Sequence, residues 1–128
     1  MIHLLIVDRL QTMCETMVAV LREEPDICVV GVATTPGQGL ALLSGCDMVL
    51  VTANLPEDGA IDFIHAVSRV DPHKKVLAMD VKDGQSAAAY YMDAGAADCV
   101  LENESVEELL SKVRAIYRGA QMAQPVRA

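Results

Sequence analysis

Aromatic side chains and positive charge are both scarce in this chain of 128 residues. Aromatic residues make up 3% of it, with no tryptophan, one phenylalanine and three tyrosines. Proteins that bind single-stranded nucleic acid stack the bases on aromatic rings, so this class is disfavoured. The chain has 10 lysines and arginines against 18 acidic residues, a net charge of −8. We therefore expect this chain to bind neither nucleic acid nor an anionic membrane surface directly.

Metal-binding cysteine motifs and long hydrophobic runs are also missing. The four cysteines, Cys14, Cys28, Cys46 and Cys99, lie far apart and form no CxxC pair. Their spacing gives no support for zinc ligation, and their apolar neighbours predict buried free thiols. No stretch approaches the roughly 18 apolar residues that span a bilayer, and only a four-residue apolar run precedes Asp8. These absences predict a protein of the reducing cytoplasm.

Hydrophobic residues are plentiful, at 52% of the chain, and short apolar runs recur along it. A chain of this size can bury one sizeable core. The runs are almost continuously apolar, which is typical of strands buried on both faces of a parallel sheet. The predicted strands cover residues 2–7, 27–32, 48–51, 76–79 and 99–101.

Segments with helical spacing of apolar residues lie between and after the predicted strands. Thr12 with Glu15, and Ser105 with Glu108, have the spacing of capping boxes that open a first and a last helix. Thr35 before a proline predicts the start of the second helix. The predicted helices cover residues 10–21, 36–44, 60–70, 85–94 and 106–117.

Five strands alternating with five helices predict a three-layer, doubly wound α/β fold of the flavodoxin-like type. The expected order of the parallel strands is 2-1-3-4-5. We expect one domain over residues 1–118 and a tail, or the start of a linker, over residues 119–128. Ligands of such sheets bind outside the carboxyl ends of the strands, and the candidate site is expected there.

Three segments of the sequence resemble a CheY-like receiver domain of two-component response regulators. They are IHLLIVDRLQTM and its continuation over residues 2–43, DMVLVTANLPEDG over 47–59, and GAADCVLENESVEELL and its continuation over 95–120. The first segment and the tail are similar to receivers with a LuxR-type DNA-binding output. The resemblance implies a bacterial, non-enzymatic domain for signal transduction and transcription regulation, although related domains also precede pilus-assembly ATPases.

The residues that receivers use for phosphorylation are largely replaced. The resemblance implies an acidic pair that holds Mg²⁺ after the first strand, where this chain has Asp8 and Arg9. It implies a phosphoryl-accepting aspartate at the end of the third strand, where Thr52 stands. A hydroxyl without an activating base is a poor nucleophile, and a guanidinium opposes cation binding.

The remaining family positions differ as well. A serine or threonine is expected after the fourth strand and a lysine after the fifth, but this chain has Asp80 and Glu102. The aromatic switch position is occupied by Cys99. Phosphoryl transfer needs cations near the equatorial oxygens, and these carboxylates place negative charge there instead. We therefore expect a phosphorylation-independent pseudo-receiver with no catalytic residue.

Other interpretations of the site residues stay open. Asp8 is the one candidate metal ligand, and it either braces its loop or retains some cation binding, so we expect no cofactor and doubtful Mg²⁺ binding. Arg9 either forms an ion pair with Asp8, Asp80 or Glu102, or points into solvent. The alternative function is a sensor of a small ligand or a divalent metal, with Asp8, Asp80 and Glu102 gathered in one altered pocket.

Helical surfaces near the end of the chain are the expected contact region. We expect a protein partner, or a second copy in a homodimer, to bind through the helices over 85–94 and 106–117 or through the edge of the strand over 99–101. The low charge of residues 85–100 favours such a contact.

Overall fold

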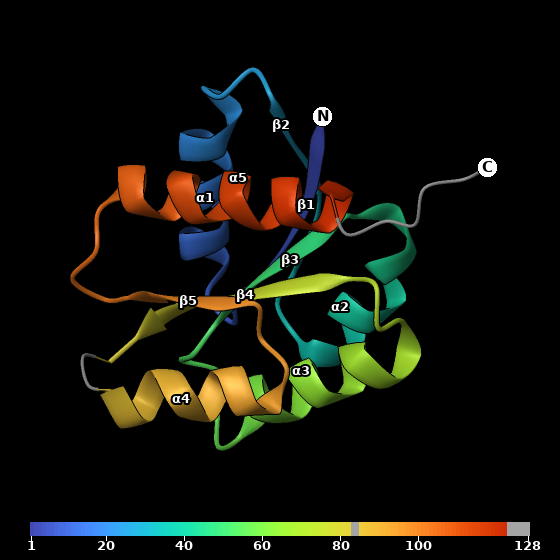
Figure 1. The fold of residues 1–128 in the computed structure, drawn as a ribbon, viewed down its shortest axis with the longest axis vertical. Helices are drawn as coiled ribbons and strands as arrows, with labels where there is room; N and C mark the ends of the chain where they lie inside the picture. The colour runs from blue at the N-terminus through green and yellow to red at the C-terminus, as the bar shows by residue number, and fades with distance from the viewer. Residues whose placement is uncertain (83–84, 123–128) are drawn as a thin grey trace.

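The computed structural model describes residues 1–82 and 85–122 and confirms the predicted fold class (Figure 1). Five parallel strands form one sheet in the order β2-β1-β3-β4-β5. The strands are β1 (Ile2–Val7), β2 (Ile27–Ala33), β3 (Met48–Thr52), β4 (Lys75–Val81) and β5 (Asp98–Leu101). The helices are α1 (Gln11–Arg22), α2 (Pro36–Ala41), the 3₁₀ turn η1 (Leu43–Gly45), α3 (Gly59–Val70), α4 (Gln85–Ala94) and α5 (Val106–Met122).

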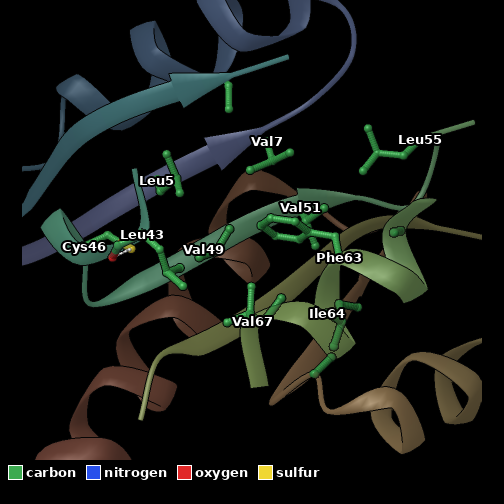
Figure 2. Close-up of a cluster of buried hydrophobic side chains, with 14 of the residues drawn as sticks. Leu5, Val7, Leu43, Cys46, Val49, Val51, Leu55, Phe63, Ile64 and Val67 are labelled. Atoms are coloured by element: carbon green, nitrogen blue, oxygen red, sulfur yellow. Dashed lines mark hydrogen bonds between the residues drawn. The ribbon is translucent and has the colours of Figure 1, made fainter. Parts of the chain in front are cut away.

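Helices cover both faces of the sheet and create two separate cores. α1 and α5 lie on one face, and α2, α3 and α4 lie on the other (Figure 1). Every side chain of β3 is buried, as the continuous apolar run predicts for a central parallel strand. Figure 2 shows the core on the α3 side, where Phe63 packs against side chains of β1 and β3.

Local hydrogen bonds explain where two of the helices begin. Thr35 Oγ1 accepts a hydrogen bond from Gln38 N at 3.2 Å and caps α2 as predicted. Ser105 Oγ accepts from Glu108 N at 3.2 Å, and Glu108 Oε1 accepts from Ser105 N at 3.3 Å. This reciprocal pair confirms the capping box at α5.

The predicted capping box at the first helix is wrong. α1 begins at Gln11, so Thr12 already lies within the helix. Leu10, which precedes the helix, has no side chain that could cap it. The turn before α1 is held instead by Asp8, whose Oδ1 accepts a hydrogen bond from Leu10 N at 3.0 Å. The side chain that stabilises the start of α1 is therefore the carboxylate of Asp8, and not the hydroxyl of Thr12.

Three further expectations need correction. α2 ends at Ala41, and the predicted end near residue 44 belongs to η1. α5 continues to Met122, four residues into the predicted tail, while residues 123–128 lie outside the described residues. Cys28 is exposed, unlike the other three cysteines, because it lies on the edge strand β2. Within the described residues, no helix has both the length and the hydropathy needed to cross a membrane.

An arginine of α5 ties the last helix to the loop before β2. Arg114 Nε donates to Asp26 Oδ2 at 2.9 Å, and its Nη2 donates to Glu24 Oε1 at 2.7 Å. The hydrogen bonds from Arg114 lower the pKa of the Asp26 carboxyl below its usual value. This contact ties α5 to the loop between α1 and β2, at the end of the sheet where β2 begins.

Close packing of α2 against the sheet generates the first prediction. A Cβ atom at Gly39 would lie 2.9 Å from Phe63 Cε1 and 3.0 Å from Val7 Cγ2. Both neighbours are buried and cannot move freely, so we expect Gly39→Ala to lower the free energy of unfolding by about 1–3 kcal/mol. Denaturant unfolding measures this change.

The same helix offers the matched control. A Cβ atom at Gly37 would meet nothing within 4 Å. Gly37→Ala should therefore leave stability unchanged or raise it by up to about 1 kcal/mol, through helix propensity alone. Equal stability of the Gly39 variant and the wild type would contradict the close approach of α2.

Candidate functional site

The carboxyl ends of β1, β3, β4 and β5 meet at one end of the sheet, and the five predicted site residues all lie there. Asp8, directly after β1, is 6% exposed, and Thr52, the last residue of β3, is 0% exposed. Asp80 lies near the end of β4 and is half-buried. Arg9 and Glu102 are exposed. The predicted residues therefore divide into a buried set and a surface set.

Asp8 braces the loop between β1 and α1. Its backbone N donates to Ala33 O at 3.0 Å, and its side chain accepts from Leu10 N through Oδ1. Its backbone O accepts a hydrogen bond from the buried thiol of Cys14 at 3.4 Å. These contacts correspond to the bracing alternative for Asp8, and they hold its carboxylate at the end of the sheet.

Arg9 does not form the predicted ion pair with a site carboxylate. Its side chain is exposed, and the ion pairs formed among residues 1–82 and 85–122 do not include it. The physical reason is local, because Arg9 lies within the turn that the hydrogen bond from Leu10 N to Asp8 Oδ1 closes, and its side chain is exposed there. Of the two alternatives for Arg9, an ion pair or a side chain in solvent, the structure shows the second.

Thr52 stands at the position where receivers carry the phosphoryl-accepting aspartate. Its hydroxyl oxygen accepts a hydrogen bond from Asn54 N at 3.2 Å. Full burial and this contact satisfy the hydroxyl within the turn after β3. The arrangement holds the backbone of that turn, and among the described residues the hydroxyl makes no hydrogen bond to a base that could activate it as a nucleophile.

A bulge in β4 determines how Asp80 is presented. Ala78 pairs with Cys99 and Val81 with Leu101, so two residues of β4 oppose one residue of β5. Asp80 has a φ of 56°, in the left-handed region, which aspartate tolerates better than most residues. The extra residue moves Val81 into the small core on the α4 side and leaves Asp80 beside the opposite face.

The carboxylates at this end of the sheet repel one another. Burial raises the pKa of the Asp80 carboxyl above its usual value, and the negative charges of Asp8 and Glu102 raise it further. The three side chains are therefore close enough to interact electrostatically. The negative charges of Asp80 and Glu102 lie where receivers place a hydroxyl and a lysine around the phosphoryl group.

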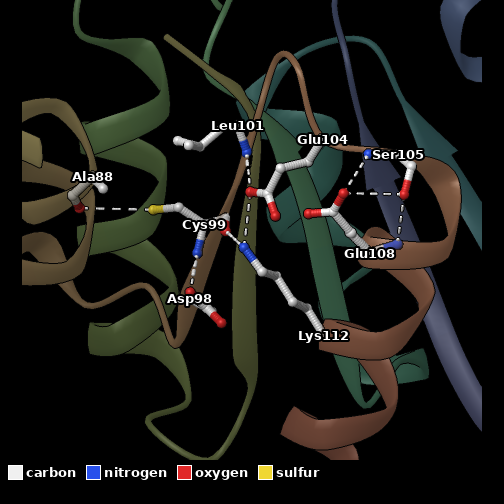
Figure 3. A network of polar contacts seen from close by, with 8 residues as sticks. All are labelled: Ala88, Asp98, Cys99, Leu101, Glu104, Ser105, Glu108 and Lys112. Atoms are coloured by element: carbon white, nitrogen blue, oxygen red, sulfur yellow. Dashed lines mark hydrogen bonds and ion pairs between the residues drawn. The ribbon is translucent and has the colours of Figure 1, made fainter. Parts of the chain in front are cut away.

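A polar network connects β5 to α5 beside the site, as Figure 3 shows. Lys112 Nζ donates to Cys99 O at 2.6 Å and to Glu104 Oε1 at 2.9 Å. Glu104 Oε1 also accepts from Leu101 N at 2.8 Å. The bond from Leu101 N, together with Lys112, lowers the pKa of Glu104 to about 2. The ammonium group of Lys112 is thus bound to the backbone of β5 and to Glu104, and makes no hydrogen bond to Thr52.

Cys99, at the position of the aromatic switch, is a structural residue in this fold. Its thiol is buried and points toward Ala88 O of α4, at 3.7 Å (Figure 3). Burial, followed by the charge of Asp98, raises the pKa of the thiol to about 11. A buried thiol of this kind is unreactive at neutral pH, and it is too small to act as an aromatic switch.

A cavity of about 130 Å³ brings together three of the predicted site residues. Asp8, Asp80 and Glu102 lie on its border, whereas Thr52, Arg9 and Cys99 do not. Its remaining lining is mostly apolar and comes from α1, α5 and the sheet. Sequence reasoning missed this apolar lining, as well as Glu104 and Lys112, because a methionine or a lysine on an amphipathic helix carries no distinguishing sequence signal.

The residues present do not fit the Mg²⁺ that receivers hold. The second acidic position is Arg9, and its exposed side chain offers no oxygen ligand. In the described part of the chain, no three histidine, cysteine or acidic side chains are grouped closely enough to hold a metal ion. Asp8 on its own does not form a divalent cation site.

Comparison with known proteins shows the family. The family model of the response regulator receiver domain matches residues 4–114, and the chain belongs to this family. A LuxR-family two-component response regulator from an Aurantimonas species has a similar fold, with a TM-score of 0.86 at 23% identity over 92% of this chain and 86% of that one. The response regulator domain of Thermotoga maritima CheB gives a TM-score of 0.79 at 21% identity, covering 97% of this chain and 98% of that one.

Full-length relatives are longer than this chain. A protein-glutamate methylesterase/protein-glutamine glutaminase of Caulobacter vibrioides is 28% identical over 93% of this chain and 38% of its own length. The response regulator UvrY of Escherichia coli is 25% identical over 93% of this chain and 56% of its own length. The chain therefore spans about two fifths to about half of these curated relatives.

The repulsion at Asp80 generates the second prediction. The raised pKa means that the folded state binds the Asp80 proton more tightly than the unfolded state, so this group contributes stability at low pH and loses it as pH rises through its folded pKa. We expect Asp80→Asn to raise the free energy of unfolding at pH 7, because asparagine removes the charge and tolerates the left-handed backbone. This gain in the free energy of unfolding should shrink as the pH falls toward 3.8, the ordinary pKa of an aspartate carboxyl in the unfolded chain.

Denaturant unfolding at several pH values tests this expectation, with Arg9→Gln as the control. Arg9 is exposed and should change stability by no more than about 0.5 kcal/mol. A loss of stability in Asp80→Asn at pH 7 would show that the carboxylate has a stabilising partner and would contradict the proposed repulsion.

Proposed function

We propose that this receiver domain works without phosphorylation, as a protein-interaction or dimerisation module of a bacterial transcription regulator. The observation that carries the proposal is Thr52, a fully buried hydroxyl at the position of the phosphoryl-accepting aspartate. The cytoplasmic location predicted from the sequence is part of the same proposal, and so is the absence of catalytic activity in this chain.

The chemistry around Thr52 supports this proposal. An acyl phosphate forms on a carboxylate, and the oxygen of Thr52 is already bonded to Asn54 N. The charges near the transferred group have the wrong sign, because Asp80 and Glu102 stand where receivers have a hydroxyl and a lysine. Lys112, the nearby cation of α5, is engaged by Glu104 and the backbone of β5.

The surface formed by α4 and β5 supports a role in association. β5 is an edge strand, and an edge presents backbone groups that a partner can pair with. Tyr90 and Met92 of α4 are large apolar side chains with exposed surface. We propose a second copy of the domain as the occupant of this surface, since receiver domains of the LuxR-type family to which the chain is similar often associate with themselves.

The third prediction concerns phosphoryl transfer. After treatment with acetyl phosphate and Mg²⁺, intact-mass analysis should find no phosphoryl adduct on this chain, because no carboxylate occupies the acceptor position. A receiver domain that retains the acidic pair and the acceptor aspartate serves as the positive control in the same reaction. A stoichiometric adduct on any site residue would overturn the proposal, and Thr52→Val would show whether the hydroxyl carries it.

The fourth prediction concerns self-association. Sedimentation velocity over rising protein concentration should detect a dimer, and Tyr90→Lys should weaken it at least about tenfold by placing a charge in the apolar contact. Val70→Lys is the matched control, because Val70 is an exposed apolar residue at the end of α3. A strictly monomeric wild type, or equal weakening by both variants, would contradict the proposed surface.

A further inference from the structure

We propose that the cavity between α1 and α5 binds a small organic cation, namely a protonated amine attached to a compact apolar group. This site does not depend on the proposed function, because it uses the cavity beside the acceptor position and not Thr52 itself. The inference rests on three features: the apolar walls, the charge at the border, and a buried carboxylate with an unused oxygen.

The walls of the cavity are mostly apolar and come from α1, α5 and the sheet between them and the other helices. Met13 and Met17 of α1 lie on one side, and Val106 and Leu109 of α5 lie on the other. The sheet supplies the remaining apolar wall through Ile6, Met79 and Val100. Methionine side chains are flexible and polarisable, so these walls can adapt to the shape of a ligand.

The lining of the cavity carries acidic side chains and lacks a balancing charge among the described residues. Among the residues that the structure describes, four carboxylates line the cavity, and this part of the lining includes no lysine, arginine or histidine. Glu104 is neutralised by Lys112, which leaves Asp8, Asp80 and Glu102 without a cationic partner among the described residues. A positive ligand would relieve the repulsion that these three side chains exert on one another.

Asp8 gives independent evidence for a ligand, because its side chain is more than nine-tenths buried. Its Oδ1 accepts from Leu10 N, and its Oδ2 receives no hydrogen bond from any residue the structure describes. Every fully buried side-chain oxygen among these residues has a hydrogen-bond partner. Since Oδ2 has none, this oxygen is not fully enclosed by protein atoms. Asp8 lines the cavity, which offers space for an N–H donor to its carboxylate.

The size of the cavity selects an organic cation over a metal ion. Its volume is about 130 Å³, close to the roughly 150 Å³ of a protein cavity that holds benzene. The carboxylates are not grouped closely enough to hold a metal among the described residues. An amine carries its charge on an apolar body, which matches a cavity lined by both carboxylates and apolar side chains.

The entrance to the cavity is accessible. Met13 is 42% exposed and Val106 is 44% exposed, and both line the cavity. Leu10, next to the same loop, is a third exposed apolar residue near the start of α1. A ligand that enters between α1 and α5 would cover these side chains and remove apolar surface from water.

Methionine methyl groups provide a direct readout in the intact chain. Three of the seven methionines, Met13, Met17 and Met79, line the cavity, and the other four do not. With ¹³C-labelled methionine methyl groups, titration with benzylammonium should shift these three NMR signals in a saturable way. The signals of Met1, Met48, Met92 and Met122 act as internal controls and should stay in place.

Neutral and metallic probes test the recognition of charge. Benzyl alcohol has nearly the same shape and should bind at least about tenfold more weakly, because it offers no charge to the carboxylates. Mg²⁺ should cause no saturable shift of the three signals below about millimolar concentration. Equal binding of benzyl alcohol and benzylammonium, or saturation by micromolar Mg²⁺, would overturn the proposal.

Two variants and a control complete the experiment. Asp8→Asn and Asp80→Asn should each weaken benzylammonium binding by about tenfold or more, whereas Asp62→Asn on the exposed surface of α3 should leave it unchanged. Should Asp8→Asn fail to fold, Asp80→Asn keeps the test open, because removal of that charge is expected to stabilise the fold. Absence of a saturable shift in the wild type, or unchanged affinity in Asp80→Asn, would reject the site.

Discussion

Burial of the central strand β3 on both faces is the constraint on which the candidate site depends. The helices on the two sides leave no water around this strand, so Thr52 at its end must satisfy its hydroxyl inside the protein, which it does through Asn54 N. A buried carboxylate at the same place would need cations or a metal to offset its lost hydration. In this chain the positions where receivers have a hydroxyl and a lysine are occupied by Asp80 and Glu102. A third carboxylate at position 52 would be repelled by both, whereas the uncharged threonine is not.

The bulge in β4 gives the site its particular shape. One extra residue opposite β5 reverses the alternation, so that Asp80 lines the cavity and Val81 packs on the other face. The left-handed backbone at Asp80 allows this turn of the strand at little cost for an aspartate. As a result a carboxylate joins Asp8 and Glu102 around an apolar cavity, and the site becomes a negative pocket.

Charge on α5 has taken a structural role beside this pocket. Lys112 and Glu104 hold the end of β5 against the helix (Figure 3). Arg114 holds the same helix against the loop before β2. These contacts tie α5, which forms one wall of the cavity, to β5 and to the loop between α1 and β2. Lys112 is engaged by Glu104 and the backbone of β5, and the ion pairs among the described residues do not include Asp80.

The sequence by itself determined the elements and their order, since these depend on local signals. Apolar runs located all five strands, and the spacing of Ser105 with Glu108 located the start of α5, because a capping box lies within four residues. The same reasoning placed the site residues at the correct end of the sheet. Only the tertiary structure decided that Arg9 points into solvent, that Asp80 sits on a bulge, and that apolar side chains of α1 and α5 enclose a cavity. These features depend on strand register and helix spacing, which arise from contacts between residues far apart in the chain.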